Sequence, residues 1–140
     1  MIMAPVRARA PAVDNGEARL SAMIEYLRSV VLEAPERGER FHSIFVDAQR
    51  RYIGDASMGQ GEIGALTLRM RELFGRALSV GANAIIIAHN HPSGDCRPSQ
   101  NDIAATRRLA SIGEALDIEL IDHLIFTQRC VYSMRAGGQL

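Results

Sequence analysis

Two histidines one residue apart, His89 and His91, follow a strongly apolar segment in the sequence HNHPSGDCRPSQND, which spans residues 89–102. In an extended strand, side chains return to the same face at every second residue, so both imidazoles face one point. Asp102 follows a proline-serine pair that predicts a helix start, and this start returns a carboxylate to that point. Two imidazoles, one carboxylate and an open fourth position are the ligand set of a catalytic zinc site. We therefore predict that His89, His91 and Asp102 bind one Zn²⁺ ion.

The same residues also have structural interpretations. Ser99 and Asp102 stand three positions apart, which is close to a helix capping box, and taken alone this pair favours capping over catalysis. A single histidine at a strand end is also more often a hydrogen-bonded polar residue than a ligand. Two neighbouring imidazoles favour a metal, because burying both is costly unless something pairs them. Asn90 between them is expected to point the opposite way.

The segments around the motif predict an α/β protein. Residues 84–88 are uninterrupted apolar, as in a central strand that is covered on both faces. Apolar periodicity and turn residues predict the other elements. Helices are expected at residues 17–33, 70–80 and 99–116, strands at 41–46, 52–53, 118–126 and 130–134, and a glycine-rich connection at 54–64 with a short strand near 65–68. The order α-β-β-α-β-α-β-β implies a three-layer-like sandwich with a mixed central sheet flanked by helices.

Length and composition predict one ordinary globular domain. The chain has 140 residues and a formal net charge of zero, and arginine supplies every basic side chain. A disordered tail is expected at residues 1–16 and a single domain at 17–140. The zero charge does not favour nucleic acid as a partner, and no segment is long and apolar enough to cross a membrane. Cys96 and Cys130 form no paired motif, which predicts a reducing, cytoplasmic setting and a plain loop thiol at Cys96.

The joint spacing of the motif resembles that of a known family. His-x-His, seven residues, Ser, two residues and Asp resemble the metal-binding motif of the JAB/MPN (JAMM) metalloprotease fold. The fuller pattern HNHPSGDxxPSxxD resembles the RadC-like proteins, a bacterial branch of that fold. The likeness covers about residues 17–140, including the strand at 120–125 and Ser133 near the end. It implies a cytidine-deaminase-like sandwich without the N-terminal helix-hairpin-helix region that many RadC-like proteins carry.

The resemblance also implies roles for residues that spacing alone does not select. It assigns Glu39 as the general base, although Glu36 is nearby and an acidic residue at a strand start is usually only solvated. It assigns Ser99 as a hydrogen-bond donor to the oxyanion of the tetrahedral intermediate. His123 is a second candidate for the site, and a core histidine or one that contacts a ligand from behind is the favoured interpretation.

Three functions remain open on this basis. The leading one is a zinc-dependent hydrolase that cleaves an amide or isopeptide bond in an unknown peptide or protein conjugate. The second is a DNA-associated accessory module of RadC type, favoured only by the arginine pairs at 50–51 and 107–108. The third is an interaction protein in which the helix at 17–33 packs against another subunit, as in a homodimer.

Overall fold

The computed structural model describes residues 16–33, 38–61 and 65–140, so nearly all of the predicted tail at 1–16 lies outside the described residues. The elements of the described ranges follow the predicted order, α-β-β-α-β-α-β-β. They are α1 (Gly16–Val31), β1 (Glu39–Val46), β2 (Tyr52–Gly61), α2 (Ala65–Ser79), β3 (Ala84–Asn90), α3 (Gln100–Ala115), β4 (Glu119–Phe126) and β5 (Val131–Ser133). Within these ranges no helix combines the length and apolarity that crossing a bilayer requires.

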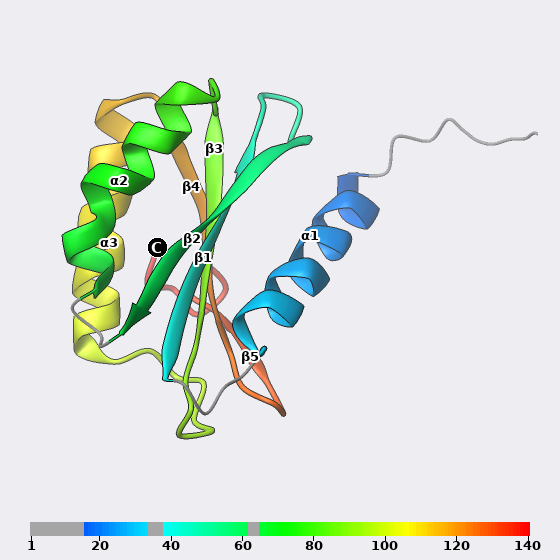
Figure 1. Cartoon of the computed structure of the whole chain (residues 1–140), viewed down its shortest axis with the longest axis vertical. Coiled ribbons are helices and arrows are strands. Elements are labelled where there is room, and N and C mark those ends of the chain that lie inside the picture. Colours follow the sequence, from blue (N-terminus) through cyan, green and yellow to red (C-terminus); the bar gives the residue numbers. More distant parts are fainter. Residues whose placement is uncertain (1–15, 34–37, 62–64) are drawn as a thin grey trace, which may run out of the picture.

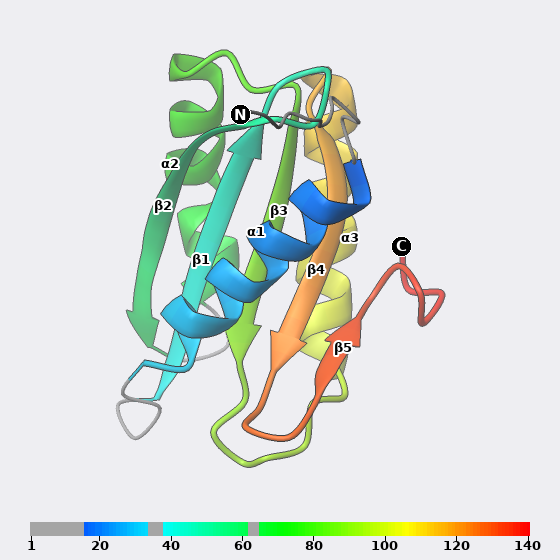
Figure 2. The same ribbon diagram turned by 90° about the vertical axis from the view of Figure 1, so that its right-hand side faces the viewer.

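The strands form one mixed sheet in the order β2-β1-β3-β4-β5. The neighbours β3 and β4 are parallel and are joined by a crossover through α3, whereas the other three pairs are antiparallel. Helices α2 and α3 cover one face of the sheet and α1 crosses the other face (Figures 1 and 2). This arrangement confirms the predicted α/β sandwich with a mixed central sheet.

Strand β3 lies between two apolar clusters, one on each face of the sheet, and all seven of its residues are buried. Ile85 and Ile87 belong to the cluster under α2 and α3, whereas Ile86 belongs to the cluster under α1. Because successive side chains alternate between the faces, an uninterrupted apolar strand serves both clusters. His89 continues the series of Ile85 and Ile87, which directs it to the α3 side of the sheet.

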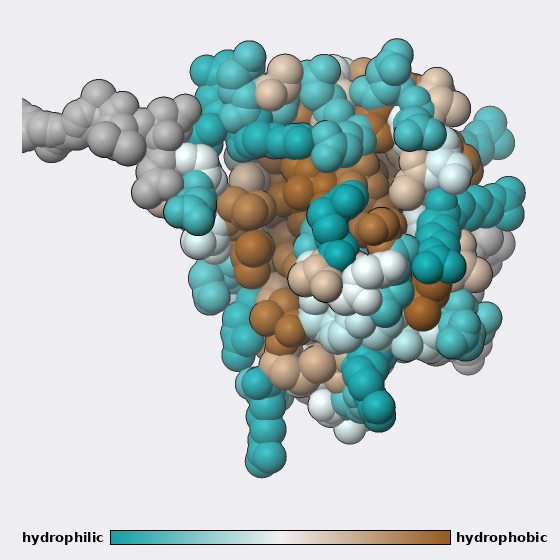
Figure 3. Space-filling view, turned by 180° about the vertical axis from the view of Figure 1, so that it is seen from behind, coloured by the Kyte–Doolittle hydropathy of each residue, from teal (hydrophilic) through white to brown (hydrophobic). Residues whose placement is uncertain are grey.

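Helix α1 packs on the sheet of its own chain. It buries Met23, Leu27 and Val31 against that face, and Tyr26 donates a hydrogen bond of 2.6 Å to Asp55 of β2. The apolar face that the sequence predicts for this helix is therefore used within the chain. Seen from behind, apolar side chains gather in a hollow that hydrophilic side chains surround (Figure 3).

Two predictions about residues 54–68 are wrong. Residues 54–61 are not an irregular connection but belong to β2, and α2 begins at Ala65, where the sequence predicts a short strand near 65–68. Strand β2 is an edge strand that pairs only with β1, with two register irregularities. Its glycines are poor strand formers and weaken the alternating pattern. The sequence Ala-Leu-Thr-Leu at 65–68 alternates like a strand, although it forms the first turn of a helix.

Gly113 allows α3 to pack closely on the start of β4. A Cβ atom at this position would overlap the carbonyl oxygen of Ile118, while the Ile118 amide donates a 2.7 Å hydrogen bond to the Gly113 carbonyl. We expect Gly113→Ala to lower the free energy of unfolding by about 1–3 kcal/mol, since backbone must move to admit the methyl group. Urea denaturation followed by circular dichroism measures this change.

Gly75 in α2 is the matched control, because a Cβ atom there meets nothing within 4 Å. Gly75→Ala is expected to stabilise the protein by up to about 1 kcal/mol, as alanine is the better helix former. Equal effects of the two substitutions would contradict the close packing at Gly113.

Candidate metal centre

The predicted site residues meet at one end of the sheet. His89 lies in β3 and His91 just beyond it, while Asp102 lies in the first turn of α3. Glu39 begins β1, whose Phe41 pairs with His89 in the antiparallel register of β1 and β3. The strand register therefore brings Glu39 to the same end of the sheet as the two histidines.

The polar atoms of these four side chains converge. The Nε2 atoms of His89 and His91 are 3.0 Å apart, and His91 Nε2 lies 3.1 Å from Asp102 Oδ2. His89 Nε2 lies 3.6 Å from Asp102 Oδ1 and 3.9 Å from Glu39 Oε1. Single ligand atoms of Glu39, His89 and His91 all lie within 4.8 Å of one another. Glu39 is thus close enough to contact a bound ion, in addition to the predicted set of His89, His91 and Asp102.

Hydrogen bonds at the opposite ring atoms orient both histidines. His91 Nδ1 is 2.8 Å from the carbonyl oxygen of Asp95, and because a carbonyl only accepts, Nδ1 carries the hydrogen. Nε2 then points its hydrogen at the Asp102 carboxylate, 3.1 Å away, and a metal ion that binds Nε2 would displace this hydrogen. Asn90 points away as predicted, and its Oδ1 accepts a 2.7 Å hydrogen bond from the Arg40 amide.

A series of buried, hydrogen-bonded side chains lies behind His89. His89 Nδ1 is 2.7 Å from Nε2 of His123, and Nδ1 of His123 is 2.6 Å from the hydroxyl of Thr106. Burial lowers the pKa of His123 well below its ordinary value, so the ring is neutral and has one donor and one acceptor nitrogen. In the arrangement in which His89 Nδ1 donates to His123 and His123 Nδ1 donates to Thr106, His89 Nε2 is the nitrogen that faces the site. His123 therefore contacts His89 from behind, as the favoured sequence interpretation holds.

The charges at the site fit a cation. Burial raises the pKa of Glu39 to about 6, and its Oε1 is buried without a hydrogen-bond partner among the described residues. Burial also acts to raise the pKa of Asp102, but hydrogen bonds from His89 and His91 outweigh it and hold that pKa below its ordinary value. Burial lowers the pKa of His89, whereas the hydrogen bond to Asp102 raises that of His91. An unpartnered carboxylate oxygen beside two adjacent Nε2 atoms is a donor set that a divalent cation satisfies.

Ser99 caps α3 and supports Asp102. Its Oγ accepts a 3.0 Å hydrogen bond from the Asp102 amide, and its own amide donates 2.9 Å to Asp102 Oδ2. This is the capping box that the spacing of the two residues suggests. A hydroxyl that accepts one bond still has its hydrogen to donate, so capping leaves the predicted oxyanion role open.

Thr106 is the residue of this site whose contact the sequence did not predict. The buried positions of α3 are Asp102, Thr106, Leu109 and Gly113, which form one helical face. The spacing of four residues from Asp102 to Thr106 was the available signal, since such residues are neighbours on a helix. What the spacing could not show is that His123 of β4 lies opposite that face.

Removing the His123 side chain behind His89 is expected to weaken metal binding. Without its partner at Nδ1, His89 loses both its fixed orientation and its preferred protonation. We expect His123→Ala to lower zinc affinity about 10–100-fold, as is typical when such a partner is removed. Competition with a chromophoric chelator at fixed pH measures the affinity.

His42→Ala is the control for this variant, because His42 is also a buried histidine but pairs with Asp55 at 2.6 Å rather than with His89. Its zinc affinity should equal that of the unaltered protein. If His123→Ala binds zinc equally well, the orienting role of His123 is wrong.

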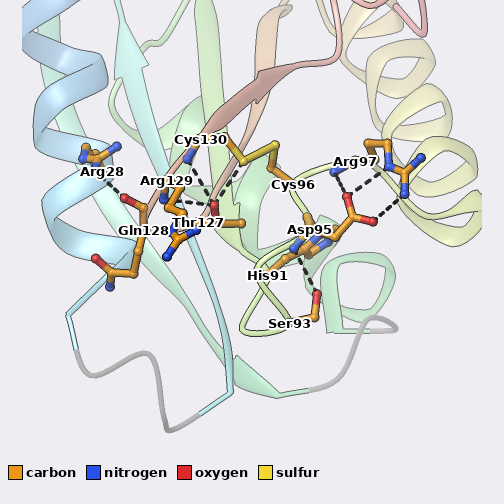
Figure 4. The surroundings of a disulfide bond; sticks show 10 residues. All are labelled: Arg28, His91, Ser93, Asp95, Cys96, Arg97, Thr127, Gln128, Arg129 and Cys130. Atoms are coloured by element: carbon orange, nitrogen blue, oxygen red, sulfur yellow. Dashed lines mark hydrogen bonds and ion pairs between the residues drawn. A yellow bond between two sulfur atoms is a disulfide. The ribbon is translucent and has the colours of Figure 1, made fainter.

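The two cysteines form a disulfide, so the prediction of a plain loop thiol at Cys96 is wrong. Cys96 and Cys130 are bonded with their Cα atoms 6.4 Å apart (Figure 4). The turn between β4 and β5 brings Cys130 beside the loop of Cys96, a contact across 34 positions that no local pattern reveals. The cysteine argument for a reducing, cytoplasmic setting therefore loses its basis.

Comparisons with known proteins point to one family. A family model described as "RadC-like JAB domain" matches residues 18–139. "UPF0758 protein YkfG" of Escherichia coli (strain K12) is 40% identical over 119 residues, which are 85% of this chain and 74% of that protein. "UPF0758 protein Reut_A2732" of Cupriavidus pinatubonensis is 37% identical over 120 residues, or 86% of this chain and 52% of that protein. The chain spans about half the length of several of these curated relatives.

Proposed function

The chain belongs to the RadC-like JAB domain family, and from this premise we propose that it is a zinc-dependent hydrolase that cleaves an amide or isopeptide bond. The observation that carries the proposal is the convergence of Glu39, His89, His91 and Asp102 at one end of the sheet. The substrate class is a peptide or protein conjugate. The activity of the whole protein is part of the proposal, because the chain spans about half the length of several relatives.

The proposed zinc ligands are His89, His91 and Asp102. When bound, Zn²⁺ supplies a water of pKa about 7 and polarises the scissile carbonyl. The carbonyl of Asp95 and the ring of His123 hold the two imidazoles with Nε2 toward the centre. The capping box of α3 holds the Asp102 carboxylate in place.

Glu39 is proposed to transfer the proton. Its carboxylate is largely buried, and burial raises its pKa to about 6, close to the pH at which a general base must both accept and release a proton. Its Oε1, which accepts no hydrogen bond from the described residues, is proposed to take a proton from the attacking water and return it to the leaving amine. The hydroxyl hydrogen of Ser99 is proposed to stabilise the charge that develops on the carbonyl oxygen.

The DNA-associated alternative loses part of its support, from the first of the two arginine pairs that favoured it. Arg50 pairs with Glu119 at 2.8 Å and Arg51 pairs with Asp47 at 2.9 Å, and these carboxylates partly neutralise the charge that phosphate contacts need. In the second pair, Arg107 donates a 3.0 Å hydrogen bond to the Gln139 carbonyl, which leaves its charge in place. DNA binding is therefore an outcome that the following experiment distinguishes from hydrolysis.

Zinc content and hydrolysis are tested on the same sample. Protein purified without added metal is analysed for bound metal and then assayed with quenched peptides and with isopeptide-linked protein conjugates. We expect about one zinc per chain, and cleavage that stops with a chelator and returns with zinc. Absence of bound metal would contradict the proposal. Salt-sensitive DNA binding in a mobility shift, together with absence of metal-dependent cleavage, would favour the alternative.

A further inference from the structure

We propose that Cys96 and Cys130 form a reversible redox site that controls how firmly the metal-binding loop is held, with a dithiol reductant as its co-substrate. The inference rests on the proposed function where it concerns zinc. The disulfide itself is an independent feature of the structure.

The disulfide acts on the segment that joins two proposed ligands. His91 begins the connection from β3 to α3, Asp102 lies in the first turn of α3 just beyond it, and Cys96 lies near the middle of the connection. Cys130 lies in the turn from β4 to β5, on the neighbouring strand pair (Figure 4). The sulfur-sulfur bond therefore ties the centre of the ligand loop to the sheet.

Hydrogen bonds alone hold the centre of this loop weakly. Among the described residues, the hydrogen bonds of residues 93–97 all have partners within the loop itself. Examples are the 3.1 Å bond from the Gly94 amide to the His91 carbonyl and the contacts of Arg97 with Asp95. Arg97 and Asp95 are mostly exposed, so their ion pair adds little stability. The disulfide is thus the strongest link of residues 93–97 to the rest of the protein.

The other end of the link is firmly held. Thr127 is buried, and its Oγ1 accepts hydrogen bonds from the amides of Arg129 and Cys130. Its own amide donates a 2.9 Å hydrogen bond to the Cys130 carbonyl. Because this turn is closed on itself, opening the disulfide should free Cys96 more than Cys130.

A small cavity lies between the two segments that the disulfide joins. Its volume is about 140 Å³, and its walls include residues of both segments. They are His91, Pro92 and Gly94 on one side and Thr127, Gln128 and Arg129 on the other. Opening the disulfide would therefore change the space directly beside a proposed zinc ligand.

The chemistry is thiol-disulfide exchange. A thiolate of the dithiol attacks one sulfur, the bond between Cys96 and Cys130 breaks, and a mixed disulfide forms. The second thiol of the reductant then displaces the protein sulfur. The protein gains two electrons and two protons as two thiols, and the reductant becomes a disulfide. Both cysteines are only half-buried, which gives a reductant access.

Cys96→Ser and Cys130→Ser test the proposal, since each removes the same bond from opposite ends. Amide hydrogen exchange of metal-free protein measures the loop, and chelator competition measures zinc affinity. We expect faster exchange at residues 93–97 in both variants, and zinc affinity about 10-fold weaker, comparable to removing a group that supports a ligand. Unaltered protein that is reduced with dithiothreitol and desalted without oxygen should match the variants, and reoxidation should reverse the change.

Unchanged loop exchange in both variants would overturn the proposal. Faster exchange with unchanged zinc affinity would show that the disulfide restrains the loop but does not control the metal centre, and this part of the proposal would be wrong. If the oxidised unaltered protein binds no zinc, the proposed function fails, and loop exchange still decides whether the disulfide restrains the loop. Differential alkylation with mass spectrometry must first find the disulfide in oxidised protein, and free thiols there would also contradict the proposal.

Discussion

Glu39→Gln is expected to lower the rate of hydrolysis about 10²–10⁴-fold while zinc stays bound, because the amide cannot accept the proton. The substitution preserves the size of the side chain, which begins β1 with Oε1 3.9 Å from His89 Nε2. Single-turnover rates with a peptide or conjugate substrate, together with zinc content per chain, measure the two effects. Glu33→Gln is the control, since Glu33 is an exposed residue shortly before Glu39 and should leave both quantities unchanged.

The pH dependence of the rate gives a second measure of the same role. Burial raises the pKa of Glu39 to about 6. A base acts when deprotonated, so the rate should rise with pH through that pKa. A bound cation favours the carboxylate form of Glu39, so this rise of the rate with pH should be centred at or below about pH 6. The residual activity of Glu39→Gln should not show this rise. An unchanged rate in the variant would remove Glu39 from the proton transfer.

The fold could largely be predicted where one segment carries its own periodic signal. Residues 84–88 are apolar without interruption, and they form the buried central strand β3. The prediction failed at β2, where glycines in an edge strand carry little alternation, and at the start of α2, where four residues alternate like a strand. The local sequence pattern predicts a central strand well, because both of its faces are buried. It predicts an edge strand poorly, because fewer of its side chains are fixed by packing.

The candidate site could be predicted only in part, because its residues come together by strand pairing. His89, His91 and Asp102 lie within one short segment, so their convergence could be argued from spacing alone. Glu39 reaches the site through the register of β1 with β3, which no local pattern contains. The contact of Thr106 with His123 and the disulfide likewise depend on how distant elements pack.

Asp102→Ala is expected to lower zinc affinity more than about 100-fold, beyond the effect of removing a group that merely supports a ligand. The carboxylate is 3% exposed and borders Nε2 of both His89 and His91, so alanine removes a ligand and the negative charge that balances the cation. It also breaks the capping box with Ser99, which should cost about 1 kcal/mol of stability. Chelator competition measures the affinity, and urea denaturation with a chelator present measures the stability.

Two further variants separate the ligand role of Asp102 from its capping role. In Asp102→Asn the amide oxygen can still accept from the Ser99 amide, so stability should recover while zinc affinity stays low. The control is Glu119→Ala, which removes an exposed carboxylate at the opposite end of the sheet whose partner is Arg50, and its zinc affinity should match that of the unaltered protein. Equal zinc content in Asp102→Ala and the unaltered protein would show that the carboxylate serves only the helix start. The metal would then have to be held by Glu39 and the two histidines, whose ligand atoms lie within 4.8 Å of one another.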